Sequence, residues 1–187
     1  MVTNSVIALP YPRYKIEEGA VKADGLISIS PSDTSFYEAP IPKENFGEIL
    51  ALRFDDIPAI HLWDTGRTLK GPTIESLETA LAFAKRTLGR NSQAKIAVNC
   101  LAGKSRSAAI ALAVNATAAK EAWGNGHEAQ TVAELLTHDP DQQMCFNPKI
   151  IDDADRLLDN QRGLHNALHK LCAPYRSWRE YWERQIP

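Results

Sequence analysis

The chain contains 187 residues, a length typical of one compact domain, and we expect a single domain over residues 1–187. Hydrophobic residues make up 44% of the sequence and charged residues 24%, which is ordinary for a soluble globular protein. The formal net charge of −2 argues against bulk electrostatic binding to nucleic acid or to an anionic membrane surface.

The cysteines and the N-terminal segment indicate a reducing compartment. There are three cysteines, at positions 100, 145 and 172, and they form no CxxC pair, which argues against a disulfide framework or a cysteine-rich zinc site. Residues 1–15 lack the pattern of a signal peptide. No apolar run approaches the roughly 20 residues that a membrane span requires. We therefore expect a cytoplasmic protein.

Short apolar runs predict strands in the first half of the chain, at residues 6–9, 25–30, 48–54 and 95–99. The first run is weak, because Pro10 and Pro12 follow it and proline does not donate to a strand ladder. The third is apolar and short, and it is interpreted as a buried strand. The last has the continuous apolar centre of a parallel strand that is covered on both faces.

Apolar residues at helical spacing predict helices at residues 74–88, 105–123, 129–138, 147–159 and 164–172. Thr73 is expected to cap the first of these helices, and Asn147, followed by a proline, to cap the fourth. The second is apolar nearly all round, so we expect it at the centre of the fold. Interleaved strands and helices followed by helices alone predict an α/β fold. Its central, mostly parallel sheet has four to five strands flanked by helices, and its C-terminal half is helical.

One loop concentrates the chemistry of the sequence. The stretch VNCLAGKSRSAA, residues 98–109, joins the predicted strand at 95–99 to the central helix. The carboxyl ends of parallel strands form the binding crevice, and a helix N-terminus offers unpartnered N–H groups to an anion. Arg106 adds a planar pair of donors suited to two phosphate oxygens. The same positive field favours the thiolate form of Cys100, which is the nucleophilic form.

This loop resembles the Cys-x5-Arg signature of the cysteine-dependent protein tyrosine phosphatases. Cys100, Gly103 and Arg106 match that signature, and Ser107 stands where the family has serine or threonine. The order of predicted elements is similar to that of the dual-specificity-like branch. The segment FNPKIIDDADRLLD, residues 146–159, resembles small bacterial members. The family implies a phosphatase-like fold for the single domain.

The resemblance implies phosphomonoester hydrolysis in two steps. Cys100 attacks phosphorus and gives a cysteinyl-phosphate while an aspartic acid protonates the leaving oxygen, and the same aspartate then activates water. Arg106 and the loop amides hold the equatorial oxygens. The residues expected to bind phosphate are Leu101, Ala102, Gly103, Lys104, Ser105 and Ser107. The family needs no metal or other cofactor, and its partner is a phosphorylated protein or another phosphomonoester.

Three aspartates are candidates for the general acid. Asp55 and Asp56 follow the predicted strand at 48–54, so they face the same crevice as the cysteine. Asp64 follows a tryptophan, which resembles the Trp-Pro-Asp loop of larger tyrosine phosphatases. Strand-end placement and an acid directly before isoleucine favour Asp56, with the other two as alternatives.

One departure from the family pattern and two other functions are left open. Asn99 stands where the family usually has histidine; it can hydrogen-bond the loop backbone but cannot carry a charge. Lys104 adds a positive charge that suits a strongly anionic substrate such as a phosphoinositide. The same loop also fits a phosphate-binding module without turnover, or a sulfur transferase of the rhodanese type. The presence of both Cys100 and Arg106 argues against the binding module, and Arg106 with a strand-end carboxylate favours phosphoryl chemistry over sulfur transfer.

Overall fold

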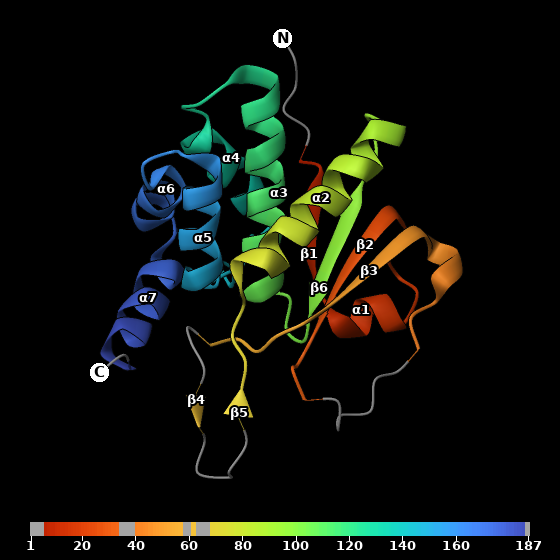
Figure 1. Cartoon of the computed structure of the whole chain (residues 1–187), viewed down its shortest axis with the longest axis horizontal. Coiled ribbons are helices and arrows are strands. Elements are labelled where there is room, and N and C mark those ends of the chain that lie inside the picture. Colours follow the sequence, from red (N-terminus) through yellow and green to blue (C-terminus); the bar gives the residue numbers. More distant parts are fainter. Residues whose placement is uncertain (1–5, 34–39, 58–60, 63–67, 186–187) are drawn as a thin grey trace.

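A computed structural model describes residues 6–33, 40–57, 61–62 and 68–185 of the chain. Four strands form one sheet in the order β1-β6-β2-β3, with every neighbouring pair parallel. These strands are β1 (Ala8–Pro12), β2 (Ala23–Ser30), β3 (Phe46–Arg53) and β6 (Ile96–Cys100). The short strands β4 (His61–Leu62) and β5 (Thr68–Leu69) pair with each other, apart from this sheet (Figure 1).

Most of the described helices lie in the second half of the chain. They are α1 (Arg13–Glu17), α2 (Ile74–Arg90), α3 (Arg106–Trp123), α4 (Glu128–Leu136), α5 (Pro148–Leu158), α6 (Gly163–Leu171) and α7 (Ala173–Gln185), with a short 3₁₀ turn at Lys43–Asn45. The predicted α/β fold, with a parallel sheet and a helical C-terminal half, is confirmed. Among the described helices, none has both the length and the apolar character that crossing a membrane requires.

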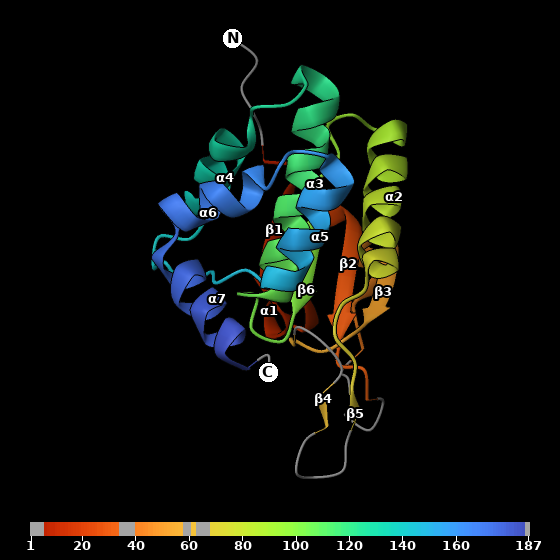
Figure 2. The same cartoon turned by 60° about the vertical axis from the view of Figure 1, so that its left-hand side comes forward.

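The two faces of the sheet are covered unequally (Figure 2). The large core lies on one face, where α2 and α3 pack on the strands and α5 packs behind α3. The other face carries a small cluster of apolar residues from α1 and the strands around it. The helix α3 is buried along most of its length, as its uniformly apolar sequence predicts, because it lies between the sheet and α5.

Side chains of β6 alternate between these two faces, so Cys100 and the preceding residue, Asn99, lie on opposite faces of the sheet. Val98 and Cys100 belong to the large core, whereas Ala97 belongs to the α1 face. Asn99 therefore lies on the α1 face of the strand. The cysteine points toward the start of α3, where its sulfur meets the hydroxyl of Ser107.

Two strand predictions were wrong in instructive ways. Pro10 and Pro12 do not end the first strand; they lie within β1. They are tolerated because β1 is an edge strand that pairs only with β6, and an edge strand has one side without ladder bonds. The strand predicted to be buried, β3, is the opposite edge, and its central residues Glu48, Ile49 and Leu50 are only half-buried. The helices α1 and α7 were not predicted.

The two predicted helix caps are confirmed. The Oγ1 atom of Thr73 accepts a hydrogen bond from the backbone N–H of Ser76 at 3.2 Å, at the start of α2. The Oδ1 atom of Asn147 accepts one from the N–H of Ile150 at 3.1 Å, at the start of α5. These caps fix where the two helices begin, at the same end of the sheet as the loop after β6 (Figure 1).

A buried side chain of α3 holds the edge strand β1 in place. The Oδ1 atom of Asn115 accepts from the N–H groups of Ile7 and Ala8 at 2.9 and 3.0 Å, and its Nδ2 atom donates to the carbonyl of Ala8 at 2.9 Å. β1 is thus fastened to the central helix through its N-terminal end, while its C-terminal end approaches the loop after β6.

Replacing Asn115 with leucine should remove this attachment. An orphaned buried polar group costs about 1–3 kcal/mol, so we expect the free energy of unfolding to fall by about 3 kcal/mol. Urea denaturation measures this change. The same substitution at the exposed Asn166 on α6 is the control and should change stability little. Equal effects of the two substitutions would contradict this role for Asn115.

Candidate active site

The loop between β6 and α3 lies at the carboxyl end of the sheet. Cys100, the last residue of β6, is only 2% exposed, and its Sγ atom lies 3.2 Å from the Oγ atom of Ser107. That serine is fully buried in the first turn of α3. A hydroxyl in this position is able to donate a hydrogen bond to a thiolate sulfur, which stabilises the charged form.

Arg106, the first residue of α3, is turned inward. It is 6% exposed, and its Nη1 atom donates to the carbonyl of Phe54, just beyond β3, at 2.8 Å. Its Nε atom is buried and has no hydrogen-bond partner among the described residues. A guanidinium has five donors and no acceptor, and leaving one of them buried without a partner is costly. The chemistry of this donor set fits a bound oxyanion.

Gly103 allows the loop to pack closely on the end of β1. Its φ is +74°, a left-handed conformation that a residue with a side chain adopts only with strain. A Cβ atom built there would lie 2.5 Å from the nitrogen of Pro12. The N–H of Arg13 also donates to the carbonyl of Leu101 at 3.2 Å. The first half of the loop is therefore fixed to the junction of β1 and α1.

The second half of the loop is fixed from the other side. The N–H groups of Cys145 and Phe146 donate to the carbonyl of Lys104 at 3.0 and 3.3 Å, and that of Asn147 donates to the carbonyl of Ser105 at 3.2 Å. The described chain has no cis peptide bond, and the C=O and N–H of a trans peptide point in opposite directions. Because these carbonyls point outward, the N–H groups that follow them point toward the inside of the loop.

Among the predicted phosphate-binding residues, the side chains divide into two sets. Leu101 is 68% exposed, and Ala102 and Lys104 are also exposed, so these residues offer the loop interior their backbone rather than their side chains. Lys104 has no ion-pair partner among the described residues. Ser105 and Ser107 are buried. An anion at this loop would thus be held mainly by amides.

Asp56 lies against the loop. Its Oδ1 atom accepts hydrogen bonds from the Oγ atom of Ser105 and from the Nδ2 atom of Asn147, both at 2.8 Å. Ser105 and Asn147 are the residues that precede α3 and α5, so the carboxylate joins the starts of two helices. Partial positive charge at helix N-termini favours a carboxylate there. The structure thus places the favoured acid candidate beside the loop.

The other two acid candidates fare differently. The carboxylate of Asp55 is 8% exposed and accepts from the N–H and the hydroxyl of Ser32 and, at 2.9 Å, from the N–H of Lys70. These hydrogen bonds hold the segment after β2 against the segment after β5, so Asp55 has a structural role. Asp64 lies outside the described residues.

Asn99 does not make the predicted hydrogen bond to the loop. Its side chain is fully buried, and neither its Nδ2 nor its Oδ1 atom has a hydrogen-bond partner among the described residues. In the sheet it stands beside Tyr11 and Ser28, on the face opposite the cysteine. Neighbouring side chains of a strand point to opposite faces, which explains this placement. The prediction failed because it assumed that Asn99 lies near the loop on account of its position next to Cys100.

The other two cysteines differ from Cys100 in their surroundings. Burial, with the nearby carboxylate of Asp56, raises the pKa of the Cys145 thiol to about 11, so this thiol stays protonated at neutral pH. Burial also raises the pKa of Cys172, whose Sγ atom lies 3.3 Å from the carbonyl of Met144. Neither thiol has the character of a nucleophile.

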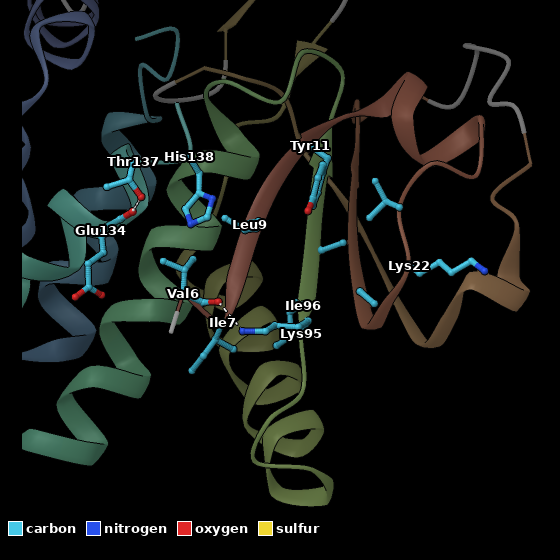
Figure 3. A pocket seen from close by; sticks show the side chains of 13 residues that line it. Val6, Ile7, Leu9, Tyr11, Lys22, Lys95, Ile96, Glu134, Thr137 and His138 are labelled. Atoms are coloured by element: carbon cyan, nitrogen blue, oxygen red, sulfur yellow. Dashed lines mark hydrogen bonds between the residues drawn. The ribbon is translucent and has the colours of Figure 1, made fainter. Parts of the chain in front are cut away.

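Two cavities lie on the α1 side of the loop. One of about 640 Å³ is lined by Ala102, Gly103 and Lys104 together with the start of α1 and residues 138–144. The other, of about 550 Å³, contains none of the predicted site residues. Figure 3 shows Tyr11 and His138 at its sides and Leu9 on its floor.

Several solved phosphatase structures are similar to this chain over most of its length. Human DUSP28 is 16% identical, with a TM-score of 0.55, and the match covers 83% of this chain and 90% of that one. Tk-PTP in its active form is 14% identical, with a TM-score of 0.54 and coverages of 85% and 99%. PTPMT1 in complex with PI(5)P is 16% identical, with a TM-score of 0.51 and coverages of 83% and 92%.

The chain has the fold of the tyrosine and dual-specificity phosphatases. This agrees with the fold that the Cys-x5-Arg resemblance implied. Neither the family models nor the sequences of curated proteins match the chain. The similarity to known proteins is therefore one of fold, and the function has to be inferred from the residues of the site.

Gly103→Ala tests the seating of the loop, by which we mean its close packing against the end of β1 at Pro12. A left-handed alanine costs about 1–3 kcal/mol, and the added carbon also meets Pro12, so we expect stability to fall by about 2 kcal/mol or more. Calorimetry should show that tungstate binding weakens by about tenfold or more, which is 1.4 kcal/mol. Gly89→Ala is the matched control, because a Cβ there meets nothing within 4 Å. Unchanged tungstate binding in Gly103→Ala would contradict the proposed seating.

Proposed function

We propose that this protein is a phosphomonoester hydrolase that works through a cysteinyl-phosphate intermediate. One observation carries the proposal: a buried cysteine, a buried arginine with a spare donor and a carboxylate are assembled around a single loop whose amides turn inward. The shared phosphatase fold supports it.

Cys100 is the nucleophile in this proposal. Its sulfur attacks phosphorus, the S–P bond forms, and the bond between phosphorus and the leaving oxygen breaks. Ser107, 3.2 Å from the sulfur, donates to the thiolate and stabilises it again when the sulfur leaves in the second step. The start of α3 adds partial positive charge at the same place.

Arg106 and the inward amides hold the transferred group. Their donors are aimed before the substrate arrives, since the loop is fixed to β1 on one side and to residues 145–147 on the other. Such preorganised donors stabilise the charge that develops on the equatorial oxygens without reorganising during the reaction. The spare Nε donor of Arg106 supports this assignment.

Asp56 is the general acid and then the general base. It gives its proton to the leaving oxygen in the first step, and it accepts a proton from the attacking water in the second. Its contact with Ser105 favours it over Asp55, whose carboxylate is committed to Ser32 and Lys70. Asp64 stays an alternative.

The substrate class is a phosphate monoester on a protein or on another molecule. The exposed Lys104 and Leu101 at the loop offer a positive charge and an apolar contact to the rest of the substrate. One structural neighbour was solved with the phosphoinositide PI(5)P, and this supports testing lipid as well as protein substrates. The subtype similar to small bacterial enzymes and the cytoplasmic location belong to the same proposal.

Cys100→Ser separates hydrolysis from mere phosphate binding. A serine hydroxyl does not ionise near neutral pH, so turnover of p-nitrophenyl phosphate should fall by about 10⁴-fold or more, as when a covalent nucleophile is lost. Binding of inorganic phosphate should persist, because the amides and Arg106 are unchanged. Cys145→Ser is the matched control and should retain turnover. Phosphate binding without turnover in the unaltered protein would favour the binding module, and thiosulfate activity would favour a rhodanese.

Asp56→Asn tests the acid. Losing a general acid costs about 10²–10⁴-fold in rate, so kcat should fall by about that amount. The pH dependence that a titrating acid gives the rate should flatten, while vanadate binding stays nearly intact. Steady-state kinetics across pH with aryl phosphates measures both effects. An unchanged pH profile would move the role to Asp55 or Asp64.

A further inference from the structure

Asn147 joins three parts of the site through one side chain and its backbone. It is fully buried and precedes α5. Its N–H donates to the carbonyl of Ser105 at 3.2 Å, its Oδ1 accepts from the N–H of Ile150 at 3.1 Å, and its Nδ2 donates to Oδ1 of Asp56 at 2.8 Å. The residue thus links the loop, the start of α5 and the carboxylate.

The orientation of this amide is forced by its surroundings. The N–H of Ile150 is a donor at the start of a helix and needs an acceptor, so the carbonyl end of the Asn147 side chain must face it. The NH₂ end then necessarily faces the carboxylate of Asp56. Rotating the amide by half a turn would set donor against donor and oxygen against oxygen.

Capping alone does not require asparagine at this position. Serine, threonine and aspartate cap helices about as well, because capping needs only an acceptor. Asparagine carries its acceptor and its donor on two separate atoms, so it bonds the N–H of Ile150 and the carboxylate of Asp56 at the same time. A serine or threonine hydroxyl has both functions on a single oxygen that lies one bond nearer the backbone, and aspartate offers acceptors only. The side-chain NH₂ group of Asn147 donates to Asp56, so the residue has a second contact besides capping α5.

The two bonds to Asp56 select which of its oxygens carries a proton. Both donors, from Ser105 and from Asn147, are directed at Oδ1. A proton on the neutral carboxyl must therefore reside on Oδ2. Asp56 also lies beyond the end of β3, in a bend, so its place is not set by the ladder of the sheet. The side-chain bonds fix the carboxyl group.

We propose that Asn147 is a positioning residue that holds the carboxyl group of Asp56 in the orientation for proton transfer. This inference rests on the proposed function, because it has meaning only if Asp56 is the acid. In the first step the proton passes from Oδ2 to the leaving oxygen as the S–P bond forms. In the second step water attacks phosphorus, the S–P electron pair returns to sulfur, and a proton of the water goes to Oδ2. Asn147 stays neutral and bonded to Oδ1 throughout.

Asn147→Ser tests the donor separately from the cap. Serine retains an acceptor for the helix, so thermal unfolding should change little. Its hydroxyl lies one bond nearer the backbone than Nδ2 of asparagine, so the hydrogen bond to Asp56 is lost. A leaving group of low basicity, such as p-nitrophenolate, depends little on an acid, whereas phenolate depends on it strongly. We therefore expect kcat for phenyl phosphate to fall by about tenfold or more, with a smaller fall for p-nitrophenyl phosphate and little change in KM.

Asn147→Asp gives a second, independent readout. Aspartate also caps the helix, but it places a second carboxylate beside Asp56, and two adjacent carboxylates share a proton. The high-pH limb of the rate profile should therefore move to higher pH. Thr73→Ala, which removes the cap of α2 without contacting Asp56, is the stability control and should leave the preference between the two leaving groups unchanged.

A double substitution tests whether Asn147 acts through Asp56. In the Asp56→Asn background, Asn147→Ser should have no further effect on kcat, because its role acts through the carboxyl group. Additive effects, or equal falls for both leaving groups in Asn147→Ser, would overturn this inference and leave the proposed function standing. A lack of turnover in the unaltered protein, or turnover unaffected by Asp56→Asn, would overturn the assignment of the acid and this inference with it.

Discussion

The site depends on how one loop is clamped at the end of a parallel sheet. Gly103 packs against the backbone of Pro12 on one side, and the segment at residues 145–147 binds the carbonyls of Lys104 and Ser105 on the other. Because the carbonyls of Lys104 and Ser105 point outward and each peptide is planar and trans, the N–H groups that follow them point inward. Backbone N–H groups turned inward in this way favour a bound anion, which is the basis of the proposed site.

The rest of the fold supports this clamp. The edge strand β1 ends at the loop and is fastened at its other end to α3 by Asn115, so the strand cannot shift without moving the central helix. α5 begins at Asn147, directly beside the loop, and its start meets Asp56. The sheet orders the strand ends, the helices close the large core, and together they hold Cys100, Arg106 and Asp56 around one loop.

Local patterns made much of this predictable. The cysteine, glycine and arginine of the loop allowed an anion site to be proposed from the sequence, because all three lie within seven residues of one another. The caps at Thr73 and Asn147 were predictable because capping is a local interaction. The prolines of β1 were misread, since a strand's tolerance of proline depends on whether it lies at an edge, and edges are set by the whole sheet.

Long-range contacts were beyond the sequence. Asp56 meets Ser105 across 49 positions and Asn147 across 91, and no local pattern reports such a meeting. Strand-end placement predicted the correct edge of the sheet for both Asp55 and Asp56. It did not distinguish them, because the different partners of the two carboxylates come from distant segments. The unpartnered amide of Asn99 likewise became visible only when its face of the sheet was known.

The most direct test of the central claim is a crystal structure of the protein with vanadate. The account predicts vanadium bonded to the sulfur of Cys100, its equatorial oxygens on the loop amides and on Nε of Arg106, and Oδ2 of Asp56 facing the apical oxygen. Vanadate bound elsewhere, or a Cys100 side chain turned away from an empty loop, would contradict it.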